Sequence, residues 1–205
     1  MQNDKLRLED LLESSVSNVQ DDRINSVAII GAGVMGQGIG QTIAASGMEV
    51  TIIEKNNERL EWAKAQLSET IDREIKRWAM TNSEKKAIFS RITWDIDITK
   101  IQDCDLVIEA VDEDFDLKVR IFKEMDKHAK KDAIFVSNTS TLSLTKISET
   151  TSRPDRVIGM HFLNPVPKVP LVEIVKCLHT SNETVKKVKD FANRIGKTPV
   201  EVYEY

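Results

Sequence analysis

A glycine-rich hexapeptide, GAGVMG, begins at Gly31, directly after a run of β-branched residues and directly before a helical pattern. In that context Gly31 permits a tight turn, Gly33 lets backbone N–H groups approach a pyrophosphate, and Gly36 lets the helix pack close to the strand. Val34 and Met35 then form the first helical turn, whose unpaired N–H donors and partial positive charge favour a diphosphate. The spacing predicts a dinucleotide site.

A carboxylate stands where the ribose of such a nucleotide would lie. Glu54 ends the second β-branched run, 18 residues after Gly36, and a carboxylate there accepts hydrogen bonds from both hydroxyls of the adenosine ribose. Because the same charge repels a 2′-phosphate, we expect NAD in preference to NADP, a preference that the neighbouring Lys55 weakens slightly. The alternative reading is that the glycines only allow tight packing in an α/β core.

Two polar segments further along the chain could supply chemistry. SNTSTLS begins at Ser137 and contains Asn138, a candidate cofactor contact, whereas GMHFLNPVP contains His161. Ligands of open α/β sheets bind beyond the carboxyl ends of the strands, so both segments are expected near the nicotinamide ring. His161 is the candidate base, since an unperturbed imidazole exchanges a proton near neutrality.

Glu173 is the candidate partner of His161. It lies twelve residues further on, inside the apolar run LVEIV, where an unpaired carboxylate would be costly. An imidazole nitrogen is a suitable partner, because the carboxylate would fix its tautomer and stabilise the imidazolium ion. Taken alone, such a pair could equally be a structural one.

Short β-branched runs alternate with helical patterns, which predicts a doubly wound, mostly parallel α/β sheet of the Rossmann type. The predicted strands are SVAII, EVTII, RITWD, DLVIEA, AIFVS, RVIGMHF, LVEIV and PVEVY. A long helix is predicted over 57–79, with a buried stripe that runs from Leu60 to Trp78. Capping-box spacings predict helix starts at Thr81 and Thr180, and Gly196 fits a left-handed helix stop.

Composition limits the functional classes. The 205 residues carry a net charge of −4 with lysines spread among acids, which gives no support to nucleic-acid binding. The glycines and polar residues within the long uncharged stretch from Val27 to Met48 argue against a membrane span. Two isolated cysteines predict reduced, buried thiols in a cytoplasmic protein, and no residues have the spacing of metal ligands, so no metal is expected. Residues 1–23 are expected to form a charged leader and residues 24–205 a single domain.

From about residue 24 onward the chain resembles the N-terminal domain of the 3-hydroxyacyl-CoA dehydrogenase family, which includes the 3-hydroxybutyryl-CoA dehydrogenases. The segments that carry the resemblance are VAIIGAGVMGQGI, DLVIEAV, FVSNTSTLS, RPDRVIGMHFLNPVP, LVEIV and GKTPV. The resemblance implies NAD as cofactor and (S)-3-hydroxyacyl-CoA as substrate. A stand-alone NAD-binding module or subunit, and an unrelated dehydrogenase that shares only the glycine loop, are the alternatives.

The resemblance also implies roles for single residues. His161 would take the proton of the substrate hydroxyl, Glu173 would orient it, and Ser140 would hydrogen-bond the substrate oxygen. Further residues fall at positions that contact NAD or coenzyme A in the family: Glu113, Lys118 and Asn164 for NAD, and Thr70 and Arg77 for coenzyme A. For Lys118 and Arg77 a solvated helix face is the competing explanation.

The resemblance finally implies a second domain. Family members continue after GKTPV into a helical domain that completes the acyl pocket and forms the homodimer, and this domain is absent from the 205 residues. An open cleft admits water and aligns the substrate poorly. We therefore expect this chain alone to bind NAD but to turn over acetoacetyl-CoA slowly.

Overall fold

The computed structural model describes residues 23–204, so the predicted leader lies, apart from Arg23, outside the described residues. The strands are β1 (Val27–Ile30), β2 (Val50–Ile53), β3 (Ile92–Asp95), β4 (Leu106–Glu109), β5 (Ile134–Ser137), β6 (Val157–Phe162), β7 (Leu171–Lys176) and β8 (Thr198–Tyr203). The helices are α2 (Val34–Ala45), α3 (Asn57–Lys76), α4 (Asn82–Ser90), α5 (Phe115–His128), α6 (Leu144–Ser148) and α7 (Asn182–Arg194), with short 3₁₀ turns η1 (Ile98–Ile101) and η2 (Pro154–Arg156).

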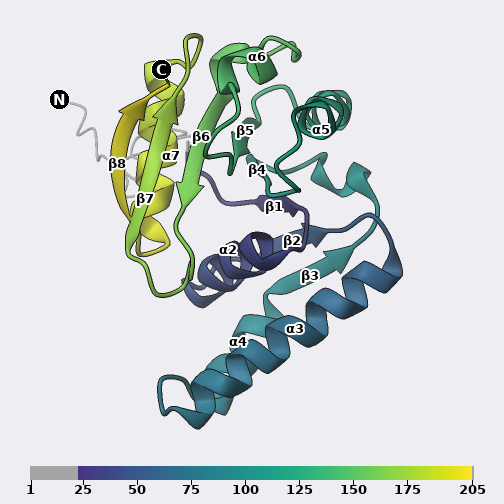
Figure 1. Cartoon of the computed structure of the whole chain (residues 1–205), viewed down its shortest axis with the longest axis vertical. Helices are drawn as coiled ribbons and strands as arrows, with labels where there is room; N and C mark the ends of the chain where they lie inside the picture. Colours follow the sequence, from purple (N-terminus) through teal and green to yellow (C-terminus); the bar gives the residue numbers. More distant parts are fainter. Residues whose placement is uncertain (1–22, 205) are drawn as a thin grey trace, which may run out of the picture.

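The strands form one sheet in the order β3-β2-β1-β4-β5-β6-β7-β8 (Figure 1). All neighbours are parallel except β6 and β7, which form an antiparallel pair. This confirms the predicted doubly wound, mostly parallel sheet. The strand order reverses between β1 and β4, and open α/β sheets bind their ligands at such a point.

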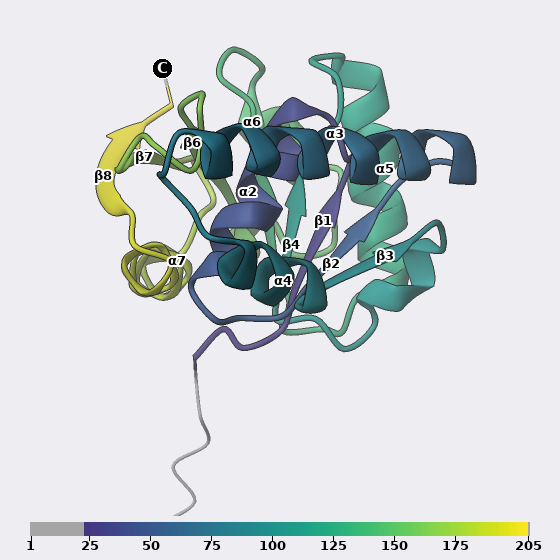
Figure 2. The same cartoon turned by 90° about the horizontal axis from the view of Figure 1, so that it is seen from below.

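Side chains of successive strand residues enter different cores, as the two-residue period of a strand requires. Ile29 and Ile108 belong to a core shared with helices α2, α3, α4 and α7, whereas Ala28 and Val107 belong to a core shared with α5 and α6. Helices therefore cover both faces, and the central strands β1, β4 and β5 are buried along their whole length. Figure 2 shows the sheet from below, with β8 and α7 at one end and β3 at the other.

The long helix α3 is shorter than predicted. Asn56 caps its first turn and Arg77 follows its last residue. The prediction that Trp78 belongs to the buried stripe is wrong: the residue has a φ of 59° and is 96% exposed. Because the left-handed conformation turns the chain away after Arg77, the residue cannot extend the buried face of α3.

Of the two predicted capping boxes, only the first is confirmed. Thr81 and Glu84 cap each other at the start of α4, but α7 begins one residue later than predicted, with Ser181 as its cap. The Thr180 hydroxyl is buried instead and donates to the Val157 carbonyl oxygen at 2.7 Å. The left-handed Gly196 is confirmed, with a φ of 76°.

Both cysteines, Cys104 and Cys177, are buried free thiols, as predicted. Burial raises the pKa of the Cys104 thiol to about 11, so this thiol stays protonated at neutral pH. Among the described residues, no helix combines the length and the apolar character that crossing a bilayer requires.

Candidate active site

The glycine turn between β1 and α2 depends on two glycines for its shape. Gly31 has a φ of 100°, and a Cβ atom there would lie 2.7 Å from the Ala110 carbonyl oxygen. A Cβ atom on Gly36 would lie 1.9 Å from the Gly31 carbonyl oxygen. Side chains at these two positions are therefore excluded by the protein itself.

Gly33 differs, because a Cβ atom there would meet nothing within 4 Å. The space in front of Gly33 is a cradle that a side chain would fill, and it adjoins the start of α2. No side chain caps this helix and no acidic residue lies in its first turn, while Val34 is 66% exposed. The start of α2 thus fits a diphosphate group.

A cavity of about 320 Å³ continues from the glycine turn. Gly31, Gly33 and Glu54 line it together with the cationic residues Lys55 and Arg59. The Glu54 carboxylate accepts hydrogen bonds from the backbone N–H groups of Ala32, at 3.1 Å, and Lys55, at 2.7 Å. The carboxylate therefore lines the cavity beside the glycine turn, where a ribose could reach it.

The candidate base and its partner lie directly opposite each other on the antiparallel pair of β6 and β7. His161 and Glu173 are register partners, and His161 Nδ1 lies 3.0 Å from Glu173 Oε2. Their side chains are 27% and 37% exposed, so the pair is open to a ligand. The loop between the strands explains the twelve-residue spacing.

The three predicted catalytic residues, Ser140, His161 and Glu173, line one cavity of about 460 Å³. Tyr203 and Glu204, at the end of β8, also line it. Reasoning from the sequence missed these two residues, because nothing in the pattern of β8 distinguishes them from an ordinary strand end.

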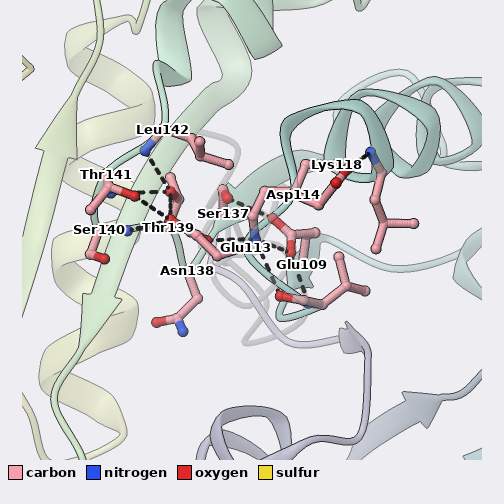
Figure 3. Close-up of polar contacts among 12 residues, drawn as sticks. Glu109, Glu113, Asp114, Lys118, Ser137, Asn138, Thr139, Ser140, Thr141 and Leu142 are labelled. Atoms are coloured by element: carbon pink, nitrogen blue, oxygen red, sulfur yellow. Dashed lines mark hydrogen bonds and ion pairs between the residues drawn. The ribbon is translucent and has the colours of Figure 1, made fainter.

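A buried polar network connects β4, α5 and the segment after β5 (Figure 3). Lys118, which is 1% exposed, lies with its Nζ 2.6 Å from Glu109 Oε1 and 3.3 Å from Glu113 Oε2. Glu109 is fully buried and also accepts hydrogen bonds from the Ser137 hydroxyl and the Val111 N–H group. The burial of Lys118 excludes the solvated face considered for it above. Glu109 was not predicted as a site residue, because nothing in the segment DLVIEA indicates that its partner is Lys118.

Glu113 extends this network to the segment that carries Ser140. Its Oε1 atom accepts hydrogen bonds from the hydroxyls of Thr139 and Thr141 and from the Ser140 N–H group at 3.3 Å. Burial opposes its ionisation, but the Thr139 hydroxyl, Lys118 and the Thr141 hydroxyl together hold the pKa of Glu113 below its ordinary value. The stability that this carboxylate contributes is present above its ordinary pKa and is lost as the pH falls through the folded value.

The remaining predicted residues divide into three groups. Asn138 joins two strand ends, since its Oδ1 accepts a hydrogen bond from the Phe162 N–H group at 3.0 Å. Val34, Thr70 and Asn164 line a third cavity, of about 580 Å³, between α2, α3 and the loop after β6. Arg77 is not among the residues that line this cavity; its side chain is 71% exposed and lies 3.9 Å from Glu74.

Lys197, which sequence reasoning named only as part of GKTPV, holds the loop between β6 and β7. Its buried Nζ donates to the carbonyl oxygens of Val166 and Val169, at 2.5 and 2.6 Å. Burial lowers the pKa of this ammonium. On its other side the loop is bound to α3, because Lys168 Nζ lies 2.9 Å from Glu74 Oε1.

Comparison with known sequences identifies relatives over nearly the whole described chain. Residues 26–205 match the family described as 3-hydroxyacyl-CoA dehydrogenase, NAD binding domain. The chain is 39% identical to a probable 3-hydroxybutyryl-CoA dehydrogenase of Bacillus subtilis and 38% identical to a 3-hydroxybutyryl-CoA dehydrogenase of Clostridioides difficile. These alignments cover 89% and 87% of the chain, and the chain spans 63% of the length of each relative.

Solved structures agree with the sequence relatives. The (S)-3-hydroxybutyryl-CoA dehydrogenase PaaH1 from Ralstonia eutropha superposes with a TM-score of 0.86 at 38% identity, over 89% of this chain and 64% of that chain. FadB2 of M. tuberculosis superposes with a TM-score of 0.87 at 34% identity, over 89% and 65% of the two chains. By sequence and by fold, the chain belongs to the 3-hydroxyacyl-CoA dehydrogenase family, of which it carries the NAD-binding domain.

Proposed function

We propose that the protein interconverts (S)-3-hydroxyacyl-CoA and 3-oxoacyl-CoA with NAD, and that short acyl chains such as 3-hydroxybutyryl are its substrates. The observation that carries the proposal is the His161–Glu173 pair, which shares one cavity with Ser140. The relatives named 3-hydroxybutyryl-CoA dehydrogenase support the acyl chain length. Since the chain spans 63% of their length, their activity is carried over here as a proposal.

The hydrogen bond between the two side chains prepares His161 for proton transfer. When Nδ1–H donates to the Glu173 carboxylate, the lone pair of the other ring nitrogen, Nε2, is free to accept a proton. Nε2 forms no hydrogen bond with any of the described residues. The carboxylate also stabilises the imidazolium ion that forms when the proton arrives.

In the proposed oxidation, His161 Nε2 accepts the proton of the substrate 3-hydroxyl while the Ser140 hydroxyl donates a hydrogen bond to the same oxygen. NAD, when bound, supplies the hydride acceptor. The glycine turn and the start of α2 would hold the diphosphate, and Glu54 the adenosine ribose. In support of this, the glycine turn follows β1, Glu54 follows β2 and Ser140 follows β5, all parallel strands of the sheet, and His161 is the penultimate residue of the parallel strand β6.

The test is NADH oxidation by acetoacetyl-CoA and by a long-chain 3-oxoacyl-CoA, measured in single turnovers at high protein concentration. We expect slow but substrate-dependent oxidation that is faster with acetoacetyl-CoA. If NADH binds saturably and neither thioester accelerates its oxidation, the chain is a nucleotide-binding module instead. If the long-chain thioester reacts faster, the proposed acyl chain length is wrong.

Glu54 is expected to decide between NADH and NADPH. In Glu54→Gln, NADH affinity should fall about tenfold or more, because charge-assisted hydrogen bonds to the ribose contribute roughly 1.5–3 kcal/mol. NADPH affinity should rise, since Lys55 and Arg59 line the same cavity and would then face the 2′-phosphate without an opposing carboxylate. Parallel fluorescence titrations measure both affinities. A variant that still prefers NADH to the original degree would place the ribose elsewhere.

The two buried thiols support a further proposal, that the protein works in the cytoplasm, where cysteines stay reduced. Formation of a homodimer through a second domain also remains a proposal, supported by the family resemblance alone.

A further inference from the structure

Lys118 is surrounded by protein oxygens. Its Nζ atom lies 2.6 Å from Glu109 Oε1, 3.3 Å from Glu113 Oε2 and 3.4 Å from the Val111 carbonyl oxygen. An ammonium group has three hydrogens to donate, and these three acceptors can take them all. The Lys118 side chain is 1% exposed, so its donors are engaged within the protein. Its influence on the site must pass mainly through its two carboxylate partners.

The two carboxylates lie in different environments. Glu109 is fully buried at the end of β4, and its second oxygen accepts a hydrogen bond from the Ser137 hydroxyl at 2.6 Å. The Glu113 side chain is 39% exposed. Its Oε1 atom faces the turn at 139–141, where two hydroxyls and the Ser140 N–H group donate to it. The network thus leads from the interior of the sheet to Ser140 (Figure 3), which lines the same cavity as His161.

The charges make Lys118 necessary to this arrangement. A buried carboxylate is stable only when it is paired, and removing one member of a buried pair is strongly destabilising. Without the ammonium, Glu109 and Glu113 would repel each other, and Glu113 has an exposed side from which it can move into solvent. The turn at 139–141 would then lose the acceptor of three of its donors.

We propose that Lys118 and Glu109 are positioning residues, which hold Glu113 in place and thereby set the Ser140 turn in the cavity that it shares with His161. The role of this turn in catalysis rests on the function proposed above. The control of the turn by Lys118 and Glu109 does not. A charge pair inside the sheet controls the order of a turn at the sheet edge. No contact between Lys118 and a nucleotide is required.

Amide hydrogen exchange of the 205-residue chain, without nucleotide, tests the claim. In Lys118→Met we expect the amides of 140–142 to exchange roughly tenfold faster or more, because local opening then costs less. Glu109→Gln/Lys118→Met removes both buried charges and is included in case the single variant does not fold. It should also accelerate the exchange of 140–142, because Glu113 still loses its ammonium partner. Lys127→Met is the matched control on the same helix, since Lys127 is 64% exposed and pairs only with Glu124 in the described residues. It should leave the turn unchanged.

Two further measurements separate positioning from a general loss of stability. If Lys118 acts through Glu113, adding Lys118→Met to Glu113→Gln should change the exchange of 140–142 little beyond the effect of Glu113→Gln alone. ADP is expected to bind at the glycine turn and Glu54 alone. The affinity of Lys118→Met for ADP should therefore stay within about twofold of the wild-type value.

Unchanged exchange of 140–142 in the folded Lys118 variants would overturn the proposal, and so would full additivity with Glu113→Gln or a large fall in ADP affinity. None of these readouts uses an acyl-CoA. Failure of the proposed dehydrogenase activity would therefore be recognised separately, as absent turnover in a protein whose turn still loosens when Lys118 is replaced.

Discussion

Replacing His161 with alanine should lower the rate of NADH oxidation by acetoacetyl-CoA by about 10²–10⁴-fold, the range typical of a lost general acid or base. In this direction the protonated imidazole supplies the proton that the substrate oxygen needs, and no other histidine lines the cavity. NADH affinity should change little, because His161 is not among the predicted nucleotide contacts. Single-turnover absorbance measurements and NADH titrations measure the two quantities.

His179 offers a matched control for this experiment. Its Nε2 atom lies 3.0 Å from Glu149 Oε1, so it forms a histidine–glutamate pair of the same length, but it does not line the cavity of His161. His179→Ala should therefore keep the wild-type rate. Glu173→Gln should lose less activity than His161→Ala, since the amide can still contact the ring but cannot stabilise its charged form. Near-normal turnover in His161→Ala would remove this residue from the role of base.

Replacing Gly33 by alanine should weaken NADH binding without loss of stability, whereas replacing Gly36 by alanine should destabilise the fold. Gly33→Ala should keep its melting temperature, since its Cβ atom meets nothing within 4 Å and its φ of −68° suits any residue. Its affinity for NADH should fall about 100-fold, close to 3 kcal/mol, because the methyl group occupies the predicted place of the diphosphate.

Gly36→Ala should destabilise the fold by about 3 kcal/mol or more, since its Cβ atom would lie 1.9 Å from the Gly31 carbonyl oxygen. Thermal unfolding and NADH titration of both variants separate the two effects. Wild-type NADH affinity in a folded Gly33→Ala variant would show that the diphosphate does not approach the turn there.

The secondary structure was largely predictable because its signals are local. All eight strands lie within the predicted runs or one residue beyond them, since buried parallel strands are continuous β-branched segments between turn residues. The helix α6 was missed because five residues, Leu144–Ser148, are too few to show a helical period. Trp78 was misplaced because the periodic pattern continues past the last residue of α3, and only the backbone turn at Trp78 ends the helix.

The site was predictable where the local sequence around a residue implies that the residue needs a partner. A carboxylate inside an apolar strand needs a partner, so Glu173 pointed to His161, and the antiparallel register of β6 and β7 brings the two together. The Glu109–Lys118 pair gave no such signal, because its members lie on a strand and on a helix and meet only in the folded chain. For the same reason, the contribution of Tyr203 and Glu204 to the cavity of Ser140 could not be foreseen.

A structure of the chain crystallised with NADH tests the central claim most directly. We expect the diphosphate against the backbone N–H groups at the start of α2, the adenosine ribose on Glu54, and the nicotinamide ring beside the cavity that Ser140 and His161 share. A nucleotide bound elsewhere, or a nicotinamide ring on the far side of the sheet from His161, would contradict the account.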